Sequence, residues 1–122
     1  MKVAIPIWNR RISPLFDTAQ RVLIVELDGE QEVARTEEQI GDVALPQKAG
    51  RLTELGARVL ICGAISRPLA EMLSAAGIEV VPFITGEVEE VLKAYVGGGL
   101  PAPQFLMPGC CGRRFRFRGG CR

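Results

Sequence analysis

The chain has 122 residues, a length that suits a single domain with a hydrophobic core of its own. Hydrophobic residues make up 48% and charged residues 24%, and no apolar stretch reaches the roughly 18 residues of a membrane span. The net charge is +1 and there is no histidine, which removes the commonest acid–base side chain and the commonest nitrogen ligand of metals.

The small net charge conceals an uneven distribution. Residues 110–122 contain five arginines and no acid, whereas all fourteen Asp and Glu lie before them. A basic tail on an acidic body either pairs with that body or recruits an anion. The N-terminal segment becomes charged too early for a signal peptide, so we expect a cytoplasmic protein with reduced cysteines.

Five strands and three helices are predicted in chain order. The strands are expected at 2–7, 21–27, 31–37, 58–62 and 78–81. The helices are expected at about 44–55, 67–76 and 87–96. Residues 8–19 are expected to be a loop, and Asp28-Gly29 a hairpin turn.

This order predicts an α/β, ribonuclease H-like fold. Right-handed crossovers place the fourth and fifth strands beside the first, which gives a five-stranded mixed sheet of order 3-2-1-4-5 with helices on both faces. Ligands of such sheets bind at the switch point, beyond the carboxyl ends of the first and fourth strands. We therefore expect a site formed by residues 8–13 and 62–66.

The expected site lacks the residues of common enzymes. Strands 2–7 and 58–62 contain no Asp or Glu, which argues against a nuclease with two metal ions. Ser13 and Ser66 have no histidine to activate them, and no phosphate-binding glycine motif follows a strand. We predict that the protein is not an enzyme.

The same segments offer groups that suit an anion. They are two guanidinium groups, two hydroxyls and a glycine before a helix N-terminus: Arg10, Arg11, Ser13, Ser66 and Gly63. Cys62 has two interpretations, as a thiolate ligand or as a small hydrophobic residue of the core. The arginines also have the plainer interpretation of solvated loop residues.

Three segments resemble the dinitrogenase iron-molybdenum cofactor biosynthesis family, which includes NifX and the C-terminal domain of NifB. They are ISPLFDTAQRVLIVEL, GARVLICGAISRPLAEMLSAAGIEVV and GEVEEVLKAYVGGGL. The resemblance covers residues 1–100. It implies a ribonuclease H-like domain that carries an iron-sulfur or iron-molybdenum cluster, or its precursor, between assembly and acceptor proteins. It also implies a histidine ligand near Leu15, so sulfur ligands would have to replace an imidazole that this chain lacks.

Residues 101–109 are expected to be a linker and residues 110–122 a Cys/Arg-rich tail. Cys110, Cys111 and Cys121 are soft ligands, and Cys62 would make a fourth. Their irregular spacing leaves open a metal or cluster site, a redox or disulfide role, and a tail without a ligand.

The tail arginines also have several interpretations. They neutralise an anionic cluster, pair with the acidic body, or bind nucleic acid, which is the least supported of the three. We predict a non-catalytic metallocluster carrier; the alternative is a nucleic-acid or protein-interaction module that acts through the tail.

Overall fold

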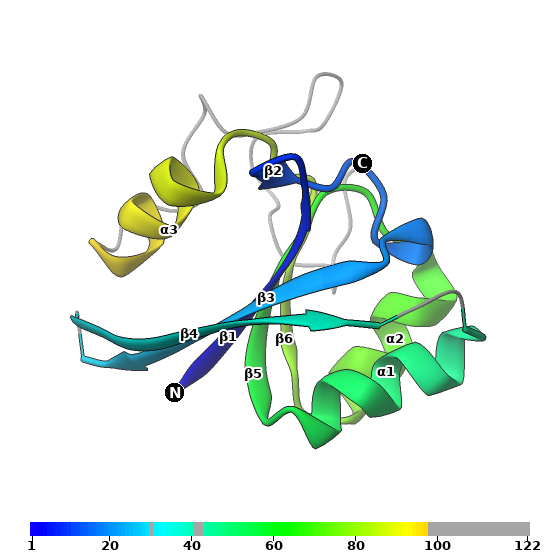
Figure 1. Cartoon of the computed structure of the whole chain (residues 1–122). Coiled ribbons are helices and arrows are strands. Elements are labelled where there is room, and N and C mark those ends of the chain that lie inside the picture. The colour runs from blue at the N-terminus through cyan, green and yellow to red at the C-terminus, as the bar shows by residue number, and fades with distance from the viewer. Residues whose placement is uncertain (30, 41–42, 98–122) are drawn as a thin grey trace.

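The computed structural model describes residues 1–29, 31–40 and 43–97, which form a mixed sheet between two layers of helices (Figure 1). The strands are β1 (Lys2–Trp8), β2 (Arg11–Ile12), β3 (Arg21–Asp28), β4 (Gln31–Gln39), β5 (Ala57–Ile61) and β6 (Glu79–Val81). The helices are α1 (Leu45–Glu54), α2 (Arg67–Ala75) and α3 (Val88–Val96), with a 3-10 turn η1 (Phe16–Thr18). No helix in these ranges is long and apolar enough to cross a bilayer.

The sheet is built around β1. Its path runs β4-β3-β1-β5-β6, and β2 pairs with β1 outside that path. β1 is antiparallel to β3 and parallel to β5, because β5 enters after the α1 crossover. The mixed α/β class predicted from the sequence is confirmed, and the expected strands correspond to β1, β3, β4, β5 and β6.

The predicted strand count of five was wrong, because β2 forms inside the segment expected to be a loop. Asn9 and Arg10 have φ angles of 52° and 66°, so the chain reverses in a two-residue turn and pairs Trp8 with Arg11. Turns of this kind usually contain glycine. The sequence lacks that signal, and the hairpin was therefore missed.

Two hydrophobic cores, one on each face of the sheet, explain why its central strands are so apolar. Alternate residues of β1 point to opposite faces of the sheet, so Ala4 packs under α1 and α2 while Val3 and Ile5 pack under α3. Figure 1 shows α1 and α2 on one side of the sheet and α3 on the other. Where a strand is buried on both faces it has no polar position, which is why residues 3–6 of β1 and 59–61 of β5 read as continuous hydrophobic runs.

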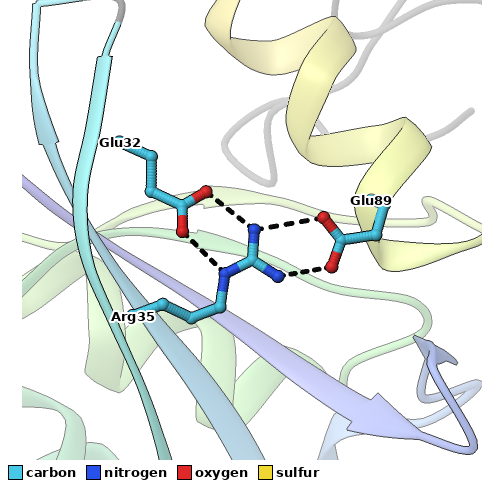
Figure 2. A network of polar contacts seen from close by, with 3 residues as sticks. All are labelled: Glu32, Arg35 and Glu89. Atoms are coloured by element: carbon cyan, nitrogen blue, oxygen red, sulfur yellow. Dashed lines mark hydrogen bonds and ion pairs between the residues drawn. The ribbon is translucent and has the colours of Figure 1, made fainter.

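An arginine on the edge strand β4 connects that strand to α3. Arg35 donates from Nε and Nη2 to both carboxylate oxygens of Glu32, each at 2.7 Å, and its other contacts go to Glu89 of α3 (Figure 2). These contacts lower the pKa of both carboxyl groups from the usual value of 4.5, since the charged form accepts the hydrogen bonds. The network therefore ties α3 to the exposed edge of the sheet.

Candidate ligand-binding site

The crevice expected between β1 and β5 is closed by the chain itself. The Phe16 amide donates to the Ala64 carbonyl and the Ala64 amide to the Pro14 carbonyl, both at 2.8 Å. A Cβ on Gly63 would lie 2.6 Å from the Ser13 carbonyl oxygen and 2.7 Å from that of Pro14. Gly63 is therefore required by the close approach of two backbone segments, and there is no room for a ligand at this point.

The amino end of α2, which the sequence suggested for an anion, already has an internal partner. Asp17 Oδ1 accepts a hydrogen bond from the Ser66 amide at 2.8 Å. A carboxylate at this position satisfies the helix terminus as a bound anion would. The Ser66 hydroxyl is buried and has no hydrogen-bond partner within the described ranges.

A buried lysine fixes the same segment from the other side. Lys48 of α1 is 1% exposed, and its Nζ donates to the carbonyl oxygens of Phe16, Asp17 and Ala19 at 3.0, 2.7 and 3.0 Å. Its ammonium also lies 5.3 Å from the centroid of the Phe16 ring. Sequence reasoning missed this residue, because a lysine in an amphipathic helix is normally solvated. The η1 turn is thus held firmly against α1.

Cys62 belongs to the core in this structure. Its side chain is fully buried among the residues under α1 and α2, and burial raises the pKa of the thiol. A protonated thiol without solvent access is a poor metal ligand, so this conformation favours the core interpretation. Cys110, Cys111 and Cys121 lie outside the described residues, among which no group of three His, Cys, Asp or Glu could hold a metal ion.

A hollow of about 960 Å³ opens on the other side of β1, toward β3. Its walls come from the β1–β2 hairpin, the loop after β2, the start of β3 and one side chain of β4. The residues that define its chemistry are Trp8, Arg10, Ser13, Leu15, Arg21 and Glu37. We call this cavity the β1–β3 hollow.

The hairpin that bears Trp8 and Arg10 is anchored to the start of α3. The Val88 amide donates to the Arg10 carbonyl and the Ile12 amide to the Gly86 carbonyl, both at 3.0 Å. These bonds hold Arg10 in its left-handed conformation, which is uncommon for a residue with a side chain. The wall of the hollow is therefore preformed.

The hollow combines apolar surface with cations. Trp8 is 64% exposed and Leu15 38%, so both present apolar surface to solvent. Arg21 forms an ion pair with Glu37 at 3.2 Å, and the two side chains are 57% and 50% exposed. A pair this exposed contributes about 0–1 kcal/mol, so a ligand can open it at low cost.

Only part of the predicted residue set lines this hollow. Arg10 and Ser13 are among its lining residues, whereas Arg11, Gly63 and Ser66 are not. Arg21 and Glu37 were missed. Arg21 had only a positional signal, since a polar residue that begins the strand antiparallel to β1 lies beside the carboxyl end of β1. Glu37 lies near the end of β4 and had no such signal.

Comparison with known proteins identifies the family. The model of the family described as dinitrogenase iron-molybdenum cofactor matches residues 1–98. The chain belongs to the dinitrogenase iron-molybdenum cofactor family. The match spans every strand and helix given above, so it includes the whole β1–β3 hollow.

Three proteins illustrate what this chain is similar to. The uncharacterized protein MJ0580 of Methanocaldococcus jannaschii is 28% identical over 105 residues, which are 82% of this chain and 89% of that protein. The crystal structure of PH0822 is 25% identical with a TM-score of 0.77, over 80% of this chain and 90% of the other. A Thermotoga protein named as a candidate NifB protein is 28% identical with a TM-score of 0.62, over 80% and 89%.

Proposed function

We propose that this family member is a non-catalytic carrier of an iron-sulfur or iron-molybdenum type cluster, or of its precursor. The observation that supports this most is the β1–β3 hollow, which offers two guanidinium groups and exposed apolar surface within a domain of the cofactor family. Metalloclusters are anions with large polarisable surfaces, and cations beside an aromatic side chain suit them. The partners would be the proteins that assemble the cluster and those that accept it.

The soft ligands of this proposal come from outside the hollow. No cysteine of the described residues lines it, so Arg10 and Arg21 would hold the charge of the cargo and not its metal ions. We assign direct ligation to Cys110, Cys111 and Cys121 of the segment 110–122, joined through the linker 101–109 to a domain at 1–100. Thiolates are the usual protein ligands of iron-sulfur clusters.

Two further parts of the proposal concern the body of the protein. The path of the sheet and the helices on both of its faces support a ribonuclease H-like architecture. The reduced thiols that the mechanism needs support a cytoplasmic location. Among the described residues, the carboxylate that lines the hollow, Glu37, is paired with Arg21, which favours carriage over acid–base catalysis.

Anaerobic reconstitution with ferrous iron, sulfide and molybdate tests the proposal. We expect the Cys110→Ser/Cys111→Ser/Cys121→Ser protein to lose bound iron and sulfide, since its thiolate ligands are gone. Arg10→Asn should retain roughly a tenth to a third of the cluster of the wild type, and Arg10→Lys most of it. Asn removes the charge but tolerates the left-handed backbone.

Equal iron and sulfide in all four proteins would contradict the proposal. The alternative, a nucleic-acid module, predicts RNA binding that weakens steeply with salt and disappears when residues 108–122 are deleted. Cluster binding without such RNA binding would exclude that alternative.

A further inference from the structure

The two cations of the β1–β3 hollow are in different states. Arg10 forms no ion pair with any described residue, whereas Arg21 is paired with Glu37 at 3.2 Å. Both arginines and the glutamate line the hollow. An anion that enters therefore meets one available guanidinium and one that a carboxylate already occupies.

The register of β3 and β4 places Glu37 in this position. Leu23 is opposite Glu37, and Arg21 is opposite Gln39, so Glu37 is the diagonal neighbour of Arg21 on the same face of the sheet. The next residue, Glu38, points to the other face and lies 3.5 Å from Arg51 of α1. Two adjacent glutamates thus form comparable ion pairs, and only Glu37 lines the hollow.

We propose that Glu37 is an internal competitor that makes the β1–β3 hollow selective for anions with two or more negative charges. A singly charged anion offers Arg21 no more charge than the carboxylate already there, so the exchange gains nothing. A dianion interacts with Arg10 and displaces Glu37 from Arg21, and Glu37 returns to solvent, where its charge is well hydrated. This inference rests on the proposed function, because it names the ligand class of the same hollow.

In a carrier, this competition between Glu37 and the bound anion would help the protein to release its cargo. The displaced carboxylate stays tethered next to Arg21 and rebinds as the anion leaves, so the bound state is weakened without any change of fold. A hollow with two unpaired arginines would hold the same anion more tightly and deliver it less readily.

Tetrahedral oxyanions of different charge provide the probes. Molybdate is a dianion and perchlorate a monoanion of similar shape, and each is titrated at constant ionic strength. Trp8 is the only tryptophan of the chain and lines the hollow, so its indole N–H resonance reports binding. We expect saturable shifts with molybdate and much weaker ones with perchlorate, which gains only the contact with Arg10.

Four variants separate the competitor role from general electrostatics. Glu37→Gln should tighten molybdate binding about fivefold, and Arg21→Gln should weaken it by a similar factor. Glu38→Gln is the matched control on the opposite face and should leave binding unchanged. In the double variant Arg21→Gln/Glu37→Gln the gain from Glu37→Gln should vanish, because Glu37 acts through Arg21.

Several outcomes would overturn the inference. They are absence of molybdate binding, equal binding of perchlorate, equal effects of Glu37→Gln and Glu38→Gln, and a gain from Glu37→Gln that persists without Arg21. The proposed carrier function is tested separately, since this titration contains no iron or sulfide. If all variants bind molybdate as expected but the protein takes up no iron or sulfide on reconstitution, the anion site is supported and the carrier function is contradicted.

Discussion

Gly63 and Gly50 lie in opposite surroundings, one crowded and one open. At Gly63 the backbone of residues 13–14 approaches so closely that no Cβ fits, whereas Gly50 is exposed within α1 and has nothing within 4 Å of its missing Cβ. The first glycine is needed for the closed β1–β5 crevice. The second only weakens a helix.

Alanine substitutions at these two glycines should therefore change the free energy of unfolding in opposite directions. Gly63→Ala should lower the free energy of unfolding by about 1–3 kcal/mol or more, because the methyl group must displace backbone atoms. Gly50→Ala should raise it by about 0.5–1 kcal/mol through helix propensity. Urea unfolding of both variants measures the difference, and equal effects would show that the approach at Gly63 is not tight.

At the scale of residues, the sequence suggested part of the set that lines the β1–β3 hollow. Arg10 and Ser13 were selected for an anion site and line the β1–β3 hollow. Gly63 was selected for the same site, but its requirement comes from packing. Lys48, Arg21 and Glu37 could not be recognised, since their roles depend on contacts between segments distant in sequence.

At the scale of elements, the contact between β4 and α3 depends on one arginine. Arg35 of β4 binds the carboxylates of Glu32 and Glu89, and it lowers the pKa of both. Because those pKa values are lower in the folded state, the stabilisation is fully present above pH 4.5 and is lost as pH falls through the lowered values.

Arg35→Gln should therefore destabilise the protein in a pH-dependent manner. We expect a loss of about 0.5–1 kcal/mol at pH 7, since the side chains of the network are partly exposed, and a smaller loss near pH 3. The control is Arg58→Gln on β5, an exposed arginine without an ion pair to any described residue. Thermal unfolding at the two pH values checks this, and a loss of equal size at both would contradict the electrostatic account.

Most elements could be predicted because their signals are local. Continuous apolar runs identified β1 and β5, and proline and glycine marked the ends of α1 and α2. β2 could not be predicted, because its two-residue turn contains Asn9 and Arg10 in place of glycine. Backbone hydrogen bonds from that hairpin to the start of α3 stabilise the turn, which the local sequence does not favour.

At the scale of the whole molecule, the β1–β3 hollow lies at the end of the sheet that the switch-point rule indicates, but on the other side of β1. The rule places ligands between β1 and β5, where this chain inserts its own residues 13–16. The open space moves to the β3 side, where the β1–β2 hairpin and β4 contribute the walls. No sequence pattern reveals that a loop will fill one side of a strand and leave the other open.

The positively charged groups of the proposed carrier are divided between the β1–β3 hollow and residues 110–122. The hollow supplies fixed cations in the body, and residues 110–122 supply three of the four cysteines and five arginines. In the proposed carrier, charge recognition and metal ligation thus come from different parts of the chain.

The central claim is that this chain carries a metallocluster, and chemical analysis of the full-length protein tests it most directly. Protein prepared anaerobically from an iron-replete host is analysed for iron, molybdenum and acid-labile sulfide. We expect bound iron and sulfide in the wild type and their loss from the Cys110→Ser/Cys111→Ser/Cys121→Ser variant. A wild-type protein that contains neither, before and after reconstitution, would contradict it.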